Sequence, residues 1–429
     1  MEVKSGFKQT EVGVIPKDWD VKPLHSLADR IMVGIASAAT HAYRDRGVVM
    51  FRNQNIKPGY LDDSDLLYIT EDYERTFKNK RLKAGDLLTA RTGYPGTTSI
   101  VPTQYEGAQS FTTLITRPRR EVVDSGYLCV FINSEAGQTY FEQNQIGGGQ
   151  KNVNAGSLKN LLIAFPPTKA EQEAIAEALS DADAFIESLE QLLAKKRQVK
   201  QGAMQELLTG KNRLPGFRGE WEVKRLGELA EIRSGGTPST TQPQFWDGDI
   251  LWCTPTDITA LNGLKYLSDT SRKISLLGLK SSSAEIIPAN SIVMTSRATI
   301  GECAINRVPV STNQGFKNFV PFEGVDVEFL YYVLLTQKQG FISLCSGSTF
   351  LEIGKAQLAI FEVCVPTTKA EQEAIASILS DMDGEIAALE ARLTKTRQLK
   401  QGMMQELLTG KTRLVDSGKL IVKNEGKEL

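Results

Sequence analysis

The sequence has few of the residues that build metal centres and disulfide frameworks. It contains five cysteines and two histidines in 429 residues. The cysteines are scattered, odd in number and form no Cys-x-x-Cys pair, so neither a zinc site nor a set of disulfides is expected. Dispersed cysteines of this kind are typical of reduced, buried thiols in a cytoplasmic protein.

Long apolar runs and a net charge are also missing. No run of about 18 apolar residues is present, so we expect no membrane-spanning helix. The polar N-terminal residues do not predict a secretory signal. The formal net charge of -1 excludes a uniformly basic, DNA-coating protein, but it leaves room for local basic patches. Hydrophobic residues make up 41% and charged residues 24%, the balance of a folded globular chain.

Motifs for catalysis or nucleotide binding are absent as well. The Gly-Lys-Thr at 410–412 is not a phosphate-binding loop, because the required earlier glycine is replaced by Gln405. No Gly-x-Gly-x-x-Gly follows a predicted strand, and no Asn-Pro-Pro-aromatic tetrapeptide of amino-methyltransferases occurs. The Glu-Val-Lys at 222–224 could end a nuclease signature, but its counterpart at 20–22 follows a matching tryptophan, which favours a structural role. The sequence predicts a protein that binds rather than catalyses.

Two segments of the chain, residues 166–214 and 366–414, are nearly identical. They align without a gap and share 34 of 49 residues, which requires an internal duplication. The preceding stretches match weakly, as in Trp-Asp-Val-Lys-Pro-Leu at 19–24 and Trp-Glu-Val-Lys-Arg-Leu at 221–226. The chain therefore has the order A1-B1-A2-B2, in which the B segments are conserved within the chain and the A segments have diverged.

Each B segment is predicted to form one helix of about 40 residues, or roughly 60 Å. Thr168 and Thr368 are placed as N-caps, a glutamate follows each at capping-box spacing, and Gly210 and Gly410 are placed to end the helices. Apolar residues recur at alternating spacings of four and three, the pattern of a coiled-coil seam. The seam residues are Ile175, Leu179, Ala182, Ile186, Leu189 and Leu193 in the first copy, and Ile375, Leu379, Met382, Ile386, Leu389 and Leu393 in the second.

The charges along each predicted helix are divided into an acidic first half and a basic second half. Antiparallel pairing of the two copies would set acidic halves against basic ones and oppose the helix dipoles. An ordinary surface pattern on two unrelated core helices is the alternative, which the near-identity of the copies disfavours. We therefore predict mixed α/β (α+β) heads, an antiparallel coiled coil of two long helices, and an internal two-fold pseudo-repeat. The expected boundaries are 1–165 for head one, 166–214 and 366–414 for the helices, 215–365 for head two, and 415–429 for a tail.

The A segments combine short apolar runs with Gly, Pro, Asn and Asp, which predicts strands and turns, with short helices near 127–131 and 329–335. Six basic residues face one acid between positions 75 and 91, and six face two acids between 272 and 317. Glycine-containing loops lie near positions 91 and 297, where Arg91 is matched with Arg297. These side chain types hold phosphates and contact base edges. Each one alone is more often a solvated surface residue, but two basic loops at matching positions together favour nucleic acid.

The candidate DNA contacts lie in these loops and in the nearby glycine-rich stretches. In head one they are Arg91, Tyr94, Gln150, Lys151 and Asn152. In head two they are Arg297, Thr299, Lys317 and Thr349.

The repeated sequences point to a known family. Lys-Ala-Glu-Gln-Glu-Ala-Ile-Ala, followed by Gln-Gly-x-Met-Gln-Glu-Leu-Leu-Thr-Gly-Lys, occurs in both copies, and residues 6–24 look like the family's N-terminal segment. Together with the divergent basic heads, these motifs resemble the specificity subunit of type I restriction-modification systems over essentially the whole chain.

The resemblance implies a division of labour between subunits. Each head would be a target recognition domain for one half of a split, asymmetric double-stranded DNA site. The helices would set the spacer and dock two modification subunits, which carry S-adenosylmethionine and methylate adenine N6. Restriction subunits, which use ATP and Mg²⁺, would join for cleavage. This chain would bind no cofactor, catalyse nothing on its own, and work in the prokaryotic cytoplasm, at the nucleoid when on DNA.

The expected docking surface for the modification subunits lies near the end of each helix. Its residues are Gln201, Met204, Leu207 and Leu208, and their copies Gln401, Met404, Leu407 and Leu408. Exposed Leu and Met there would make the chain poorly behaved without its partners.

Two other functional classes stay open at the level of the sequence. A pure assembly scaffold would bind proteins only and show no salt-dependent affinity for DNA. A self-contained nuclease or methyltransferase would act without partners, given a metal or a methyl donor. The sequence does not reveal the target bases, because indirect readout adds positions that the protein never touches.

Overall fold

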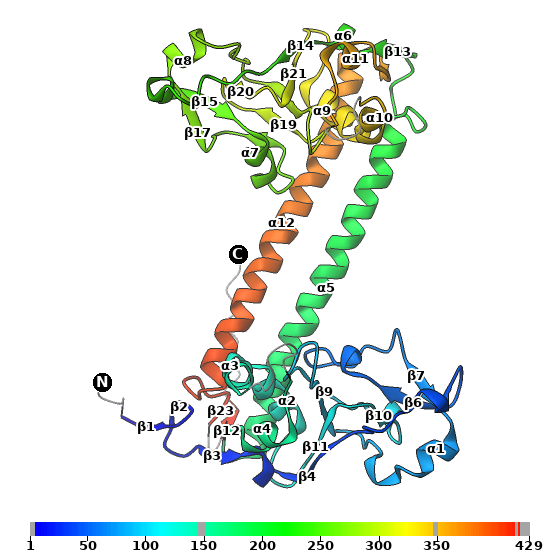
Figure 1. Cartoon of the computed structure of the whole chain (residues 1–429), viewed down its shortest axis with the longest axis vertical. Coiled ribbons are helices and arrows are strands. Elements are labelled where there is room, and N and C mark those ends of the chain that lie inside the picture. Colours follow the sequence, from blue (N-terminus) through cyan, green and yellow to red (C-terminus); the bar gives the residue numbers. More distant parts are fainter. Residues whose placement is uncertain (1–4, 145–151, 346–350, 417–418, 421–429) are drawn as a thin grey trace. The chain divides into compact units, whose positions relative to one another are not determined.

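The computed structural model describes residues 5–144, 152–345, 351–416 and 419–420. The chain divides into two compact units. Unit 1 comprises Met1–Leu189 and Arg392–Leu429, and unit 2 comprises Glu190–Ala391. Each unit therefore contains one globular head with a segment of both long helices (Figure 1). Within the described ranges, no helix has the length and apolar character that a membrane span requires.

The two long helices are α5 (Lys169–Leu207) and α12 (Lys369–Leu407), each of 39 residues. The backbone N–H of Glu171 donates to Thr168 Oγ1 at 3.4 Å, which confirms the first predicted N-cap. Gly210 and Gly410 follow the last turns with φ of +68° and +67°, the left-handed conformation that glycine adopts most readily at a helix end. The predicted helices are confirmed to within a few residues at each end.

The two glutamates at capping-box spacing have a different role from the one predicted. Glu171 and Glu371 are each 1% exposed. Glu171 Oε2 accepts a hydrogen bond from Arg413 Nη2 at 2.7 Å, and Glu371 Oε2 accepts one from Arg213 Nη2 at 2.8 Å. Each carboxylate therefore joins the start of one long helix to the segment that follows the other.

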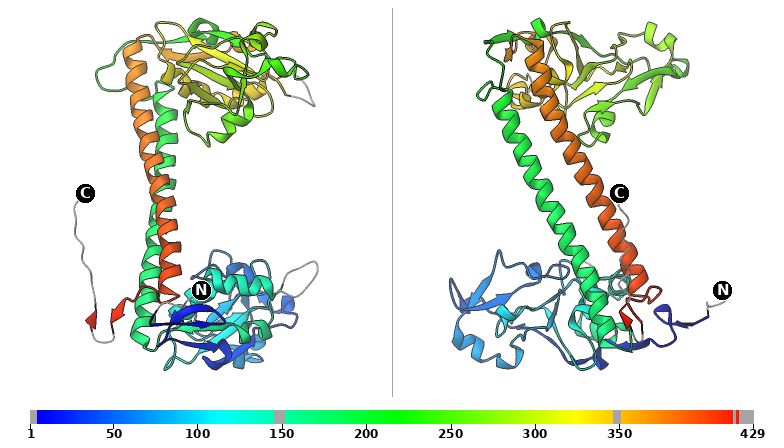
Figure 2. Two further views of the ribbon diagram at one scale, coloured as in Figure 1. Left: turned by 90° about the vertical axis from the view of Figure 1, so that its left-hand side faces the viewer. Right: turned by 180° about the vertical axis from the view of Figure 1, so that it is seen from behind.

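Segments of the two helices run side by side in both units, as the views in Figures 1 and 2 show. In unit 1, Lys400 forms an ion pair with Asp183, and in unit 2 Lys200 forms the corresponding pair with Asp383. Because Arg413 and Arg213 reach the opposite helix starts, residue numbers rise along one segment as they fall along the other. The paired segments are therefore antiparallel within each unit.

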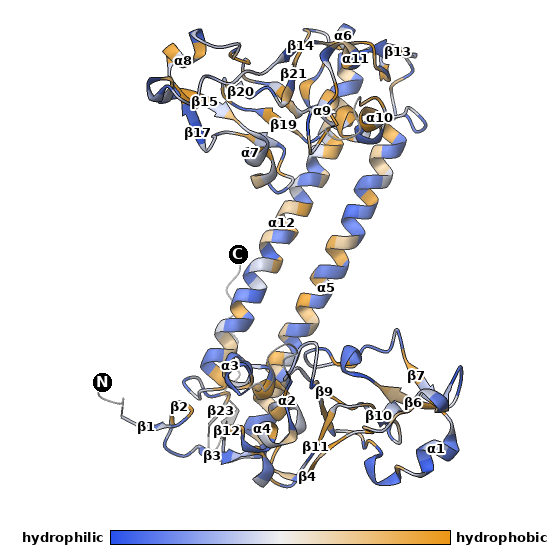
Figure 3. Cartoon of the chain, viewed as in Figure 1, coloured by the Kyte–Doolittle hydropathy of each residue, from blue (hydrophilic) through white to orange (hydrophobic). Residues whose placement is uncertain are grey.

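The less exposed positions of the two helices keep the predicted spacing of four and three. In α5 they run from Ile175 through Ile186 to Leu193 and continue through Lys196 and Lys200. The hydropathy colours of Figure 3 show polar and apolar residues alternating along both helices. The seam thus continues through these lysines, beyond the apolar residues that predicted it, because the aliphatic stem of a lysine can cover apolar surface.

Head one contains two four-stranded sheets and several short helices. One sheet has the order β4-β11-β8-β9, and the other has the order β10-β6-β7-β5. The strands of the first are Ala28–Val33, Leu114–Pro118, Leu87–Thr89 and Thr98–Ile100, and those of the second are Gln109–Ser110, Val48–Phe51, Leu67–Ile69 and Tyr43–Arg44. Two smaller pairs are β1-β2 (Phe7–Thr10, Gly13–Pro16) and β12-β3 (Leu162–Phe165, Asp20–Pro23). The helices are α1 (Glu71–Arg75), α2 (Ser125–Asn133), α3 (Glu135–Gln143) and α4 (Ala155–Asn160).

Head two contains a five-stranded sheet, a three-stranded sheet and a strand pair. Their orders are β14-β21-β18-β19-β16, β17-β15-β20 and β13-β22. The strands are, in those orders, Ala230–Ser234, Phe316–Pro321, Ser291–Thr295, Cys303–Asn306 and Tyr266–Leu267; Arg272–Ile274, Trp246–Cys253 and Ser311–Thr312; Trp221–Arg225 and Glu362–Pro366. The helices are α6 (Leu226–Leu229), α7 (Pro255–Ala260), α8 (Leu276–Lys280), α9 (Val327–Thr336), α10 (Lys338–Ser343) and α11 (Lys355–Ala359). Beyond α12 a short pair, β23 (Val415–Asp416) and β24 (Lys419–Leu420), follows in unit 1.

The two heads share one hydrogen-bonded frame despite their divergent sequences. Asp124 caps α2 and Asp326 caps α9, each accepting from a backbone N–H at 2.8 Å. The backbone N–H of each of these aspartates donates to Gln172 Oε1 or Gln372 Oε1, at 2.8 and 2.9 Å. The duplication therefore extends from the helices into the heads, with Asp124 corresponding to Asp326.

Candidate nucleic-acid interface

The two glycine-containing loops have the same hydrogen-bonding pattern. Gly96 N donates to Ala90 O, and Gly301 N donates to Thr295 O, both at 2.9 Å. A strand-like residue closes each loop, since Val153 N donates to Arg91 O at 3.0 Å and Ile353 N donates to Ser296 O at 3.1 Å. We call residues 90–97 loop one and residues 295–302 loop two.

This pattern corrects the predicted match between Arg91 and Arg297. The hydrogen bonds pair Ala90 with Thr295, so Arg91 corresponds to Ser296 and Arg297 corresponds to Thr92. The sequence match was wrong by one residue because it aligned two arginines by identity, whereas the backbone turn decides which positions are equivalent.

Loop one brings together three of the predicted contact residues. The side chain of Tyr94 is 82% exposed at the loop, and the backbone N–H of Arg91 donates to Asn53 Oδ1 at 2.7 Å. Arg91 Nε and Asn152 Oδ1 are buried atoms that find no hydrogen-bond partner among the residues described. Buried polar atoms are nearly always paired, so one unpaired donor and one unpaired acceptor mark a place for an external polar group or water. Gln150 and Lys151 lie outside the described residues.

Loop two carries an ion-pair cluster that includes two of the predicted contacts. Glu352 Oε2 lies 2.9 Å from Arg297 Nε, and Glu352 Oε1 lies 3.7 Å from Lys317 Nζ. Burial lowers the pKa of Lys317, whose side chain is 8% exposed, although Glu352 opposes that shift. Thr299 is exposed at the turn of the loop, and Thr349 lies outside the described residues.

Glu352 was missed in the sequence because it lies far along the chain from loop two. It forms an antiparallel β-bridge with Arg297, and it stands one residue before Ile353, as Asn152 stands before Val153. Aligning the two copies through this stretch would have placed Glu352 opposite Asn152 and so marked it as a candidate.

Part of the predicted basic excess is neutralised inside the heads. Arg81 forms two hydrogen bonds of 2.6 Å with the carboxylate of Glu74, which is 3% exposed and whose pKa this guanidinium lowers. Arg75 pairs with Glu71 and Asp72. These three acids lie just before residues 75–91, the segment in which the basic residues were counted. The count therefore overstated the free positive charge of that segment.

Two arginines of head two are held against aromatic rings. The Arg272 guanidinium lies 3.8 Å from the centroid of Trp246, and that of Arg307 lies 3.6 Å from the centroid of Tyr266. A guanidinium stacked on a ring keeps its in-plane N–H donors available for other acceptors. These two residues can therefore bind phosphate oxygens without losing their contacts inside the head.

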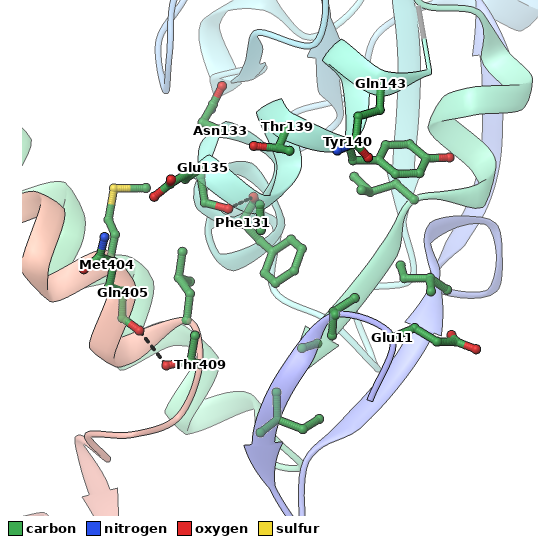
Figure 4. A pocket seen from close by; sticks show the side chains of 18 of the residues that line it. Glu11, Phe131, Asn133, Glu135, Thr139, Tyr140, Gln143, Met404, Gln405 and Thr409 are labelled. Atoms are coloured by element: carbon green, nitrogen blue, oxygen red, sulfur yellow. Dashed lines mark hydrogen bonds between the residues drawn. The ribbon is translucent and has the colours of Figure 1, made fainter. Parts of the chain in front are cut away.

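A separate cavity of about 820 Å³ lies in unit 1, beside the last turns of α12. The β1-β2 hairpin, α2, α3 and α12 contribute its walls, with Tyr140 and Met404 among the lining side chains (Figure 4). The predicted docking residues Gln401, Met404 and Leu408 all line this cavity. A second hollow of about 590 Å³ is lined by Leu399 and Leu407 among others.

The other predicted docking residues differ in how far they reach the surface. Leu208, Leu407 and Leu408 are 6%, 3% and 6% exposed and belong to the hydrophobic cores of their units. Gln201 and Gln401 are exposed, and Met204, Leu207 and Met404 are half-buried. Gln201, Gln401, Met204, Leu207 and Met404 therefore keep surface that another molecule can contact.

Within the described part of the chain, no group of three or more His, Cys, Asp or Glu side chains is placed to hold a metal ion.

A family model and individual relatives identify the same kind of protein. The family described as "Type I restriction modification DNA specificity domain" matches the chain twice, over residues 16–196 and 218–400. The type I restriction enzyme MjaIX specificity subunit of Methanocaldococcus jannaschii is 39% identical over 166 residues, which are 38% of this chain and 38% of that protein. The putative MjaX specificity subunit of the same organism is 25% identical over 440 residues, covering 96% of this chain and 97% of the other.

Solved structures agree with the fold. The S subunit of a type I restriction-modification system from M. genitalium matches with a TM-score of 0.59 at 15% identity, over 95% of this chain and 98% of that chain. At this level of identity the match speaks for the fold alone.

Proposed function

Because this chain belongs to the family of type I restriction-modification specificity subunits, with two matching specificity domains, we propose that it is the DNA-reading subunit of such a complex. Head one (residues 1–165) and head two (residues 215–365) each bind one half of a split, asymmetric site in double-stranded DNA. The chain itself performs no methylation or cleavage.

One observation carries this proposal. The two heads share a backbone frame and the same loop hydrogen bonds, yet they place different side chains at corresponding positions of loops one and two. Recognition of two different half-sites requires a shared backbone frame that carries different side chains in each head. Base edges are distinguished by the donors and acceptors that contact them.

The residues proposed to form the DNA-reading sites are those predicted from the sequence. They are Arg91, Tyr94, Gln150, Lys151 and Asn152 in head one, and Arg297, Thr299, Lys317 and Thr349 in head two. The unpaired atoms of Arg91 and Asn152 support the first set, because buried polar atoms without a partner mark a place where bound water or a small rearrangement on DNA binding would supply one. Lys317 is too buried to reach a base directly and acts through its neighbours.

The helical segments 166–214 and 366–414 form the spacer in this proposal, as an antiparallel coiled coil, and residues 415–429 are a tail. They dock two modification subunits through Gln201, Met204, Leu207 and Leu208 and through Gln401, Met404, Leu407 and Leu408. Identical partners need identical surfaces, which explains why 34 of 49 positions in these segments are the same. The cavity that Gln401, Met404 and Leu408 line supports this assignment for α12. S-adenosylmethionine, ATP and Mg²⁺ belong to the modification and restriction subunits.

The test is methylome sequencing of a host without other DNA methyltransferases that expresses this chain with its modification subunit. The expected result is a split motif with methylated adenine in both halves. An assembled complex that adds no methylation anywhere would contradict the proposal. If that complex also showed no salt-dependent affinity for DNA, a protein-binding scaffold would be the better description.

A further inference from the structure

We propose that Glu352 is a base-reading residue of head two, which accepts a hydrogen bond from an exocyclic amino group, cytosine N4 or adenine N6, while Arg297 and Lys317 hold its carboxylate in place. This inference rests on the proposed function and assigns the chemistry by which one head selects its half-site.

Backbone contacts fix Glu352 against loop two. Glu352 forms a β-bridge with Arg297, and the following N–H, of Ile353, donates to Ser296 O at 3.1 Å. Ile353 is fully buried in the hydrophobic core. The Glu352 side chain therefore projects beside the loop from a backbone that cannot shift without disturbing that core.

The charges around Glu352 suit a carboxylate that must approach DNA. An isolated carboxylate is repelled by phosphates, but here two cations, Arg297 and Lys317, flank one acid, so the cluster carries one net positive charge. Lys317 also needs this partner, because its ammonium group is buried and a buried charge is costly unless it is paired. The cluster is therefore stable before any ligand arrives.

Acceptor capacity remains on the carboxylate after both ion pairs are counted. A carboxylate has about four acceptor positions, and the two cations account for one contact on each oxygen. The Glu352 side chain is 36% exposed, and the Arg297 side chain is 46% exposed. Head two thus presents an acceptor beside the Nη donors of Arg297, since the ion pair with Glu352 is formed through Nε. This combination meets a base edge that has an amino group next to an acceptor.

Head one has uncharged side chains at the corresponding positions. Asn152 stands where head two has Glu352, and Thr92 stands where it has Arg297. Leu114 pairs with Thr89 in the sheet of head one as Lys317 pairs with Met294 in head two, so Leu114 takes the place of the lysine. The cluster is specific to head two, and its loss should affect only one half-site.

The test compares complexes of the full chain with its modification subunit. In the Glu352→Gln complex, methylation of the wild-type site should fall about tenfold or more. Methylome sequencing should show one degenerate or altered base in a single half of the motif. Glu302→Gln is the matched control, because Glu302 is a half-exposed acid of the same loop that pairs with Lys338; this variant should leave the motif and the rate unchanged.

The double variant Glu352→Gln/Lys317→Met distinguishes base reading by Glu352 from a purely structural role. It removes the buried charge of Lys317 together with the carboxylate that neutralises it. The double variant should retain the altered motif. Recovery of the wild-type motif and rate would show that Glu352 only neutralises Lys317, and an unchanged motif and rate in the assembled single variant would also overturn the inference. If the wild-type complex itself produces no split motif, the proposed function fails instead.

Discussion

The two heads are fastened to their helix segments by different chemistry. In unit 2, Lys265 Nζ donates to Glu328 Oε2 at 2.8 Å and to Ser380 Oγ at 2.6 Å. Tyr332 of α9 donates its hydroxyl proton to Asp383 Oδ2 of α12 at 2.6 Å, and Asp383 in turn pairs with Lys200 of α5. This network joins the head to both helix segments within one unit.

Unit 1 keeps the helical part of this network, but the two head positions that complete it in unit 2 carry other residues. Asp183 and Lys400 form the same ion pair as Asp383 and Lys200. Counting from the equivalent caps Asp124 and Asp326, however, the positions of Glu328 and Tyr332 are taken by Gly126 and Val130. Gly126 lets α2 approach the helix closely, since a Cβ there would lie 3.0 Å from Cβ of Ala176. Val130 packs against the hydrophobic core of unit 1, which includes Leu179 of the helix.

This difference shows which surfaces of the duplicated helices and heads are constrained. The helix residues of this network, Ser380 and Asp383, have identical counterparts in Ser180 and Asp183. These helix positions have therefore been kept although only one head uses the full network. The heads have adapted to that fixed surface in two ways. A buried polar network requires accurate geometry because each unsatisfied member is costly, whereas apolar packing tolerates small shifts.

The largest effect is expected from the arginines that neutralise the buried glutamates. Arg413→Met leaves Glu171 buried without its cation, and Arg213→Met does the same to Glu371; a lost partner of this kind costs about 3–5 kcal/mol. Trp221 Nε1 still donates to Glu371 at 3.2 Å. Trp19 Nε1, its counterpart, is unpaired among the described residues. Arg413→Met should therefore lower the free energy of unfolding more than Arg213→Met.

Urea unfolding with hydrogen exchange would locate each loss in its own unit. Adding Glu171→Gln to Arg413→Met should restore part of the stability, because the stranded charge is then removed. Equal losses for the two arginine variants would show that the Trp221 hydrogen bond contributes little.

The next effect compares one glycine position in loops one and two. Gly96 and Gly301 have φ of +94° and +83°, so an alanine at either one is strained by about 1–2 kcal/mol. A Cβ on Gly96 would also lie 2.3 Å from Cδ2 of the buried Phe141 ring, whereas one on Gly301 would lie 3.2 Å from the flexible Lys338 side chain. Gly96→Ala should therefore cost about 3 kcal/mol in total and Gly301→Ala only the strain.

Thermal unfolding of the two alanine variants checks this expectation. Similar losses in both would mean that Phe141 moves aside freely and that the two loops are equally adaptable.

A third comparison removes one tyrosine hydroxyl from each head. Tyr332→Phe deletes a hydrogen bond to the ionised Asp383, which is worth about 1.5–3 kcal/mol. Tyr127→Phe deletes a hydrogen bond of 2.7 Å to the backbone oxygen of Ala164, worth about 1 kcal/mol, and it creates the residue that head two already has, Phe329. Unfolding free energies should fall further for Tyr332→Phe. A larger loss for Tyr127→Phe would contradict the view that head two depends more on polar anchoring.

The helices and their pairing could be predicted from the sequence because their signals are local and repeated. Thr168, the seam residues and Gly410 each act within a few positions, and the duplication supplied an internal check. The identity of the heads as mixed α/β units followed from short apolar runs, although strand order did not, because register between distant strands leaves no local trace.

The candidate site was only partly predictable, for a physical reason that Glu352 and Glu74 illustrate. Both carboxylates neutralise cations that appear free when the sequence is counted in segments, since the fold brings together residues that the segment separates. Arg297 shows a second limit, which concerns the alignment of the two heads. Residue identity aligned Arg297 with Arg91, whereas the hydrogen bonds of the two loops align it with Thr92.

The smallest effect is expected from a cross-helix ion pair of unit 2, whose two positions hold Thr396 and Phe185 in unit 1. In unit 2, Lys196 pairs with Glu385 at 2.6 Å, with both side chains about half exposed. Exposed pairs of this kind contribute about 0.2–1 kcal/mol and weaken as salt rises. Lys196→Ala should lower the unfolding free energy by no more than this at low salt, and by nearly nothing in about 1 M salt, where the Debye length is about 3 Å. The charge-swapped double variant Lys196→Glu/Glu385→Lys should recover most of the low-salt loss, because the pair is restored with its sign reversed. A loss above 2 kcal/mol, or one independent of salt, would mean that the helix pairing depends on these surface charges rather than on the apolar seam beneath them.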